Sequence, residues 1–105
     1  MPVRDVRRRY LYVTVSSGGT ISEEQFNNAL YDKVHFLYGV TGASEMNLRP
    51  IEWDNAEQAA IVRVNHTMLV QARAAIAHIK EISDTEVRLD VARVSGTIKT
   101  LKSKL

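Results

Sequence analysis

The chain has 105 residues, of which 45% are hydrophobic and 25% charged, with 14 Lys and Arg against 12 Asp and Glu. These values suit one folded domain over residues 1–105. The absence of cysteine excludes disulfides, a cysteine-based zinc site and a thiol nucleophile. No apolar run approaches the roughly 18 residues of a membrane-spanning helix, and the N-terminus lacks a signal-peptide pattern. We therefore expect a cytoplasmic protein with no membrane association.

The first predicted strand covers residues 10–15, where apolar and polar side chains alternate. Leu11, Val13 and Val15 share one face, and Tyr10 and Tyr12 lie on the other, which is typical of a half-buried strand.

A helix is predicted over residues 23–38. Ser22 can cap its N-terminus, with Gln25 as the capping-box partner, and Gly39 can end it. Its buried stripe consists of apolar residues at helical spacing, namely Phe26, Leu30, Val34 and Leu37.

The middle of the chain predicts two strands. Residues 46–53 contain Pro50, which cannot donate a ladder hydrogen bond, so we expect an edge strand with a bulge. Residues 59–64 are apolar on both faces, which favours a central position in the sheet.

The last predicted elements are a helix over 67–82, a strand over 85–94 and a short helix over 97–105. The order β-α-β-β-α-β, followed by a terminal helix, is that of the ferredoxin-like, RRM-like sandwich. We expect an α+β fold: a four-stranded antiparallel sheet with strands one and three in the centre. Both long helices should lie on one face of the sheet.

The sequence shows no self-sufficient active site. His35, His66 and His78 have no metal-ligand or catalytic spacing, and the loop Ser16–Gly19 lacks the Gly-Lys-Ser/Thr of a phosphate-binding loop. A free-standing enzyme of this fold, a third possibility, would need a polar pocket with perturbed ionisable groups.

The positive charge is concentrated at the two ends of the chain. Residues 1–10 hold four arginines and one aspartate, and residues 97–105 hold three lysines and no acid, whereas residues 11–96 hold seven basic and eleven acidic residues. We distinguish a basic N-terminal arm, 1–8, and a basic C-terminal helix, 97–105. If the fold brings them together, they form a patch typical of polyanion binders; the alternative is two solvated termini.

Two tyrosines raise a second hypothesis. RRM domains stack bases on aromatic side chains of strands one and three. Tyr10 and Tyr12 occupy strand one. The third strand has no aromatic residue on either face; it offers Ala59, Ile61 and Arg63 or Ala60, Val62 and Val64. The tyrosines therefore either stack bases or pack within the fold, against the terminal helix or against a protein partner.

Two segments carry a family resemblance: Arg9-Tyr10-Leu11, which opens the first strand, and Val94 to Thr100, which includes Gly-Thr-Ile-Lys-Thr. They resemble protein component 2 of archaeal ribonuclease P, a family related to a small subunit of the eukaryotic ribonucleases P and MRP. The resemblance implies a non-catalytic subunit of the ribonucleoprotein endonuclease that removes the 5′ leader from precursor tRNA. It also implies that the RNA subunit carries the catalytic centre and uses Mg²⁺, with no cofactor on this chain.

The resemblance further implies the partners: ribonuclease P RNA, protein component 3 and, indirectly, precursor tRNA. A homodimer within a heterotetramer is a further expectation. The alternative is a protein–protein adaptor with no direct RNA contact. The candidate RNA-binding residues are the basic residues of both ends and one tyrosine, namely Arg4, Arg7, Arg8, Arg9, Tyr10, Lys99, Lys102 and Lys104.

Overall fold

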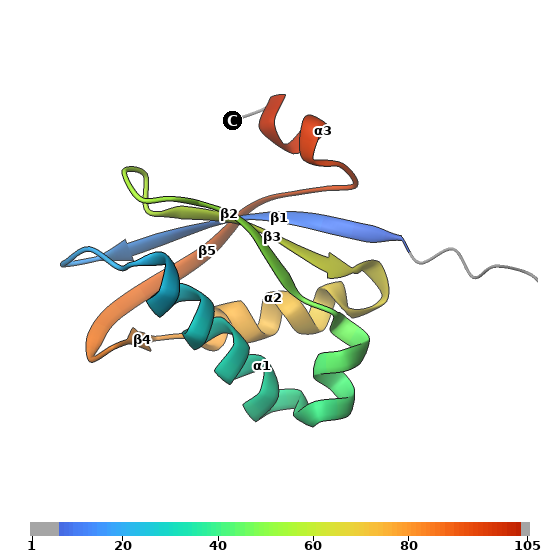
Figure 1. Ribbon diagram of the computed structural model, residues 1–105, viewed down its shortest axis with the longest axis horizontal. Coiled ribbons are helices and arrows are strands. Elements are labelled where there is room, and N and C mark those ends of the chain that lie inside the picture. Colours follow the sequence, from blue (N-terminus) through green and yellow to red (C-terminus); the bar gives the residue numbers. More distant parts are fainter. Residues whose placement is uncertain (1–6, 104–105) are drawn as a thin grey trace, which may run out of the picture.

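The computed structural model describes residues 7–103 (Figure 1). Its strands pair in one antiparallel sheet in the order β2-β3-β1-β5-β4. The strands are β1 (Arg8–Ser17), β2 (Arg49–Asp54), β3 (Ala59–Asn65), β4 (Glu81–Ile82) and β5 (Thr85–Ser95). The helices are α1 (Glu23–Met46), α2 (Leu69–His78), preceded by a 3₁₀ turn (His66–Met68), and α3 (Ile98–Ser103).

The helices lie on both sides of the sheet. Figure 1 shows α1 and α2 below it and α3 above it. The predicted mixed α/β class with an antiparallel sheet is confirmed, and β1 lies between β3 and β5. No helix within residues 7–103 is both long enough and apolar enough to span a membrane.

The sheet has five strands, whereas four were predicted. The predicted helix 67–82 ends at His78, and Ile79 already has an extended backbone with φ −78° and ψ 109°. Ser83 and Asp84 both have positive φ, 49° and 63°, the backbone of a two-residue hairpin turn. This turn joins the two-residue strand β4 to β5, so the last apolar residues of the predicted helix enter the core from a hairpin.

The main core lies between the sheet and the helices α1 and α2. The alternation predicted for β1 is confirmed, because Leu11 and Val13 are fully buried and Val15 is nearly so. Facing them are apolar residues of the two helices, which include Phe26, Leu30, Val34, Ala72, Ala75 and Ile76.

The helix α1 begins as predicted and continues further than predicted. Ser22 and Gln25 form the capping box. Gly39, with φ 69° and ψ −173°, interrupts the helix, but a second helical segment runs on to Met46. Asn47 ends this segment in the left-handed conformation. Because α1 includes Met46, which is fully buried, the predicted strand 46–53 starts only at Arg49.

The strands β2 and β3 confirm two expectations. β2 is an edge strand, and its register with β3 shifts between Pro50 and Glu52, which leaves Ile51 in a bulge. β3 is buried on both faces, since Ile61 on one face and Val62 on the other are both buried.

A second, smaller apolar contact lies on the other face of the sheet, beneath α3. Ala59, Ile61 and Leu101 are buried but lie outside the main core cluster. The side chain of Thr97 accepts a hydrogen bond from the backbone N–H of Thr100 at 3.1 Å, so it caps the N-terminus of α3. The predicted helix 97–105 is thus observed over Ile98–Ser103, and its last two residues lie outside the described residues.

The Phe26→Ala variant tests the main core. Phe26 is fully buried, and its ring centroid lies 5.1 Å from that of Trp53. Truncation should lower the free energy of unfolding by about 3–5 kcal/mol, because it leaves a cavity. Urea unfolding followed by circular dichroism measures the loss. The control is Phe36→Ala on the same helix, which should change stability by less than about 0.5 kcal/mol, because Phe36 is 81% exposed. Equal losses would contradict this packing.

Candidate nucleic-acid interface

Strand pairing brings the described parts of the two basic ends together. β1 and β5 are antiparallel neighbours, so Tyr10 lies opposite Ser95, directly before the turn into α3. Arg9 Nη1 lies 3.8 Å from the position that a Cβ would take on Gly96. The backbone N–H of His66 donates to the carbonyl of Arg7 at 2.9 Å, which fixes the start of the arginine run to the end of β3.

The basic side chains differ in how available they are. Arg7, Arg8 and Lys99 are exposed, and Arg9 is half-buried, with Nη1 donating to the carbonyl of Arg8 at 3.1 Å. Lys102 forms an ion pair with Glu52 of β2, with Nζ and Oε1 2.7 Å apart. The charge of Lys102 is therefore partly neutralised within the protein. The candidates Arg4 and Lys104 lie outside the described residues.

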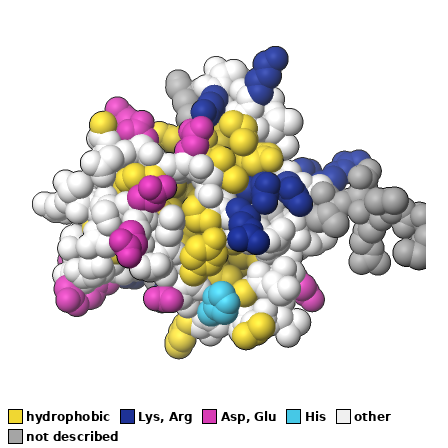
Figure 2. Space-filling model, viewed as in Figure 1, with side chains coloured by type: hydrophobic (Ala, Val, Ile, Leu, Met, Phe, Trp, Pro, Cys, Tyr) yellow, Lys and Arg dark blue, Asp and Glu magenta, His cyan; other side chains and the backbone are white. Residues whose placement is uncertain are grey.

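The sheet face beneath α3 is electrostatically divided. At one end, its register places basic residues beside Tyr10, and at the other end it places acids beside Thr14. The basic residues toward the Tyr10 end are Arg8, Arg49, Arg63 and Arg93, and the acids toward the other end are Glu52, Asp54 and Asp90. Arg88 also lies at the acidic end of this face, where it forms an ion pair with Asp90. Figure 2 shows Lys and Arg side chains gathered beside hydrophobic ones below α3, with most Asp and Glu toward the other end of the sheet.

The two tyrosines lie in different parts of this face. Tyr10 pairs with Arg63 of β3 and lies in the basic part. Burial raises the pKa of the Tyr12 phenol above its ordinary value of 10.0, and the charges of Glu57 and Asp54 raise this pKa further. Tyr12 therefore lies where the basic and acidic parts meet, and Tyr10 is the one next to the cationic side chains.

Arg49 and Arg63 were not among the residues singled out from the sequence. The sequence does indicate the face on which Arg63 lies, because Arg63 has the same strand parity as Ala59 and Ile61. Placing Arg49 opposite Arg63 requires the bulge at Ile51, whose exact position the sequence does not give.

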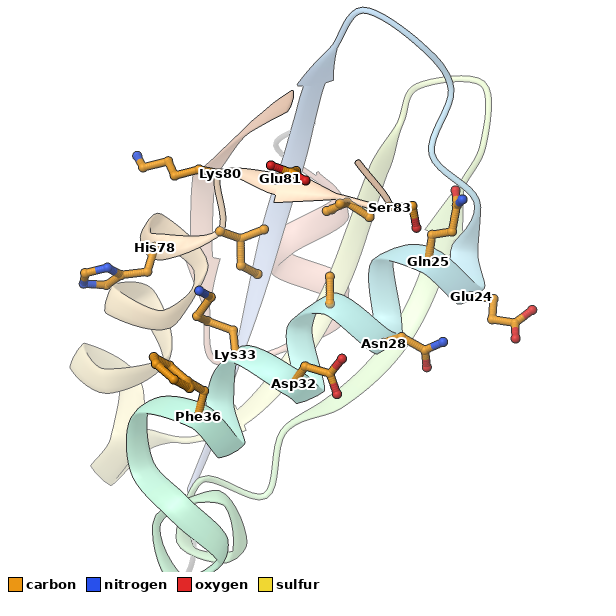
Figure 3. A pocket seen from close by; sticks show the side chains of 13 residues that line it. Glu24, Gln25, Asn28, Asp32, Lys33, Phe36, His78, Lys80, Glu81 and Ser83 are labelled. Atoms are coloured by element: carbon orange, nitrogen blue, oxygen red, sulfur yellow. The ribbon is translucent and has the colours of Figure 1, made fainter. Parts of the chain in front are cut away.

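A groove of about 720 Å³ lies on the helix side of the sheet, between α1 and residues 78–83. Its ionisable residues are of mixed charge: Glu24, Asp32, Lys33, His78, Lys80 and Glu81. Figure 3 shows these side chains spread along the groove and pointing away from one another. They do not converge on a point where a substrate could react, so the groove is a poor candidate for a catalytic site.

Comparison with known proteins identifies the family. The profile of the Rpp14/Pop5 family matches residues 9–105. Similar proteins include ribonuclease P protein component 2 of Halorubrum lacusprofundi, 29% identical over 93% of this chain and 64% of that protein. The proteins of the same name from Thermococcus kodakarensis, 28% identical over 93% and 82%, and Methanosarcina mazei, 26% identical over 99% and 88%, are also similar.

The fold is also found in a solved complex. A chain of the cryo-EM structure of yeast ribonuclease MRP superposes with a TM-score of 0.68 at 13% identity, covering 98% of this chain and 94% of that one. The chain therefore belongs to the Rpp14/Pop5 family. The resemblance inferred from its two end segments is confirmed. The chain spans 64% of the length of the Halorubrum relative.

The raised pKa of Tyr12 predicts a pH dependence of stability. Because the folded chain holds the phenol proton more tightly than the unfolded chain, this contribution to stability is complete below about pH 9 and is lost as the pH rises above about 10. Tyr12→Phe has no such proton. The difference in free energy of unfolding between Tyr12→Phe and wild type should be constant below about pH 9 and should increase in favour of the variant above it. Urea titrations across this range measure the difference, and a pH-independent value would contradict the assignment.

Proposed function

We propose that this chain is a non-catalytic protein subunit of ribonuclease P. In this role it binds and stabilises the catalytic RNA that removes the 5′ leader from precursor tRNA. The observation that supports the proposal is that Arg9 lies beside Gly96, at the turn that leads into the helix carrying Lys99, in a chain of the Rpp14/Pop5 family. Arg and Lys contacts to phosphates supply affinity without any catalytic group on the protein.

The physical task is charge neutralisation. A folded catalytic RNA crowds its phosphates, and exposed cations at Arg7, Arg8 and Lys99 lower their mutual repulsion. The RNA then needs less Mg²⁺ to hold its active conformation. Lys102 can join these contacts, because an exposed ion pair is worth only about 0–1 kcal/mol and a phosphate can replace Glu52.

A protein-binding role is compatible with this function and uses the opposite side of the molecule. Phe36, Val40 and Val70 on α1 and α2 are 81%, 78% and 76% exposed, and these helices lie across the sheet from α3 (Figure 1). Large exposed apolar side chains favour contact with a partner. In this proposal, the α1 and α2 side binds protein component 3 or a second copy of the chain. The chain contacts precursor tRNA only indirectly, within the assembled cytoplasmic enzyme.

The triple variant Arg8→Ala/Arg9→Ala/Lys99→Ala tests direct RNA binding. Each phosphate contact contributes roughly 0.7–0.9 to the log–log salt slope, so removing three contacts should flatten the slope by about 2–3. Filter binding to the catalytic RNA at several salt concentrations measures it. The matched control is Arg73→Ala/Lys80→Ala/Arg88→Ala, which removes the same charge elsewhere. Equal slopes for both triples would favour the adaptor alternative.

Reconstituted cleavage connects binding to activity. At limiting Mg²⁺, the wild-type chain should raise precursor-tRNA cleavage by the RNA subunit, and the triple variant should restore less of it. At saturating Mg²⁺ the difference should shrink, because the metal ion then supplies the missing neutralisation. An equal effect of both proteins at every Mg²⁺ concentration would contradict charge neutralisation.

Glu52→Gln tests the availability of Lys102. The variant removes the carboxylate of the 2.7 Å ion pair, so Lys102 becomes free for a phosphate. RNA affinity at low salt should increase, and the salt slope should steepen by up to about 0.9. The control is Asp90→Asn, which breaks the comparable exposed ion pair with Arg88 at 3.3 Å. A similar gain from both variants would show a general charge effect in place of a contact by Lys102.

A further inference from the structure

We propose that Arg49, Arg63 and Tyr10 form a binding site for one unpaired RNA nucleotide. The two guanidinium groups bind its phosphate, and its base stacks on Tyr10. This inference rests on the proposed function. It adds a specific contact site for single-stranded RNA, which the basic residues at the two chain ends do not provide.

The register of three strands places these residues in one row. Arg63 of β3 pairs with Tyr10 of β1 on one side and with Arg49 of β2 on the other. Directly paired residues share a face of the sheet, and neighbouring strands lie about 4.8 Å apart. Two guanidinium groups at this spacing can reach the oxygens of one phosphate, which they bind in a planar, bidentate manner.

The pairing of Arg49 with Arg63 is unfavourable in the protein alone. Like charges directly opposite on adjacent strands are destabilising. Within residues 7–103 the ion pairs lie elsewhere, at Arg88 with Asp90 and at Lys102 with Glu52. The Nε of Arg63 is shielded from water and has no hydrogen-bond partner. An anion bound between the two arginines would relieve the repulsion.

This row lies beside the part of the sheet that α3 covers. In the neighbouring row, Ile61 is buried and Glu52 is held by Lys102 of α3. One row further toward the start of β1, Arg49 is exposed and Tyr10 is half-buried. A ligand can therefore reach Arg49 and Tyr10 without moving α3.

The residue types favour an unpaired nucleotide over an RNA duplex. Unstacked bases of single-stranded RNA stack on aromatic rings and on arginine guanidinium planes. Tyr10 supplies the aromatic ring on β1 for the base, and the guanidinium groups of Arg63 and Arg49 remain available for the phosphate. In a duplex the bases are already stacked on one another, so Tyr10 would gain no contact.

The test compares two RNA probes by fluorescence anisotropy, using the full chain. The probes are an octamer of uridine and an RNA hairpin with a fully paired stem. Arg63→Ala and Arg49→Ala should each weaken binding of the octamer about tenfold and flatten its salt slope by about 0.7. Tyr10→Leu should weaken it by a similar factor with an unchanged slope, because no charge is removed. Arg88→Ala is the matched control and should leave binding unchanged.

Two further measurements separate recognition from folding. Arg63→Lys keeps the charge but loses the planar fork, so it should keep the salt slope while losing affinity. The melting temperature of Arg63→Ala should equal or exceed that of wild type, because the variant removes the repulsion with Arg49. A marked fall would overturn the argument that Arg63 is unsatisfied in the free protein.

The outcomes distinguish this site from the proposed function. Unchanged octamer binding by the Arg63 and Tyr10 variants, while the catalytic RNA still binds the wild-type chain, would overturn the site alone. Equal losses for the octamer and the hairpin would overturn its preference for unpaired nucleotides. If the wild-type chain binds neither probe nor the catalytic RNA, the proposed function fails together with the site.

Discussion

The pairing of β1 with a neighbour on each side is the constraint on which the rest of the structure depends. Side chains along this strand alternate between the two faces of the sheet, so Leu11 and Val13 lie in the main core and Tyr10 and Tyr12 lie on the face beneath α3. Because β5 pairs with β1 in an antiparallel manner, the end of β5 returns to the start of β1. The arginine run and the helix that carries Lys99 therefore lie together as a direct result of sheet topology.

This arrangement gives the molecule two surfaces of different chemistry on opposite sides of the sheet. The sheet face beneath α3 carries cations at one end and two half-buried tyrosines, whereas α1 and α2 carry large exposed apolar side chains, of which Phe36 is the most exposed. A subunit that bridges RNA and protein needs both kinds of surface, and placing them on opposite sides lets both be occupied at once. The function that we propose for the chain, positioning and neutralising charge on RNA, is consistent with a family whose named relatives are ribonuclease P proteins.

Much of the fold could be predicted because its signals are local. The capping box at Ser22, the alternation in β1 and the edge character of a strand with Pro50 each depend on neighbouring residues. The hairpin at Ser83 was missed because Ile79 and Ile82 continue the apolar spacing of α2, so a helical period hides a turn. The pair of Arg49 and Arg63 was missed for another reason: cross-strand register depends on a bulge, and one residue of shift exchanges the two faces of a strand.

The form of β2 has a consequence for how this protein can associate. An open sheet edge offers unpaired backbone groups to other chains and can seed fibres. Here Pro50 lacks a donor, the bulge at Ile51 bends the strand, and Arg49, Glu52 and Asp54 place charges along the margin. Backbone-to-backbone growth from one copy to the next is thereby discouraged along β2, so contacts at this margin depend on side chains, which can discriminate between partners.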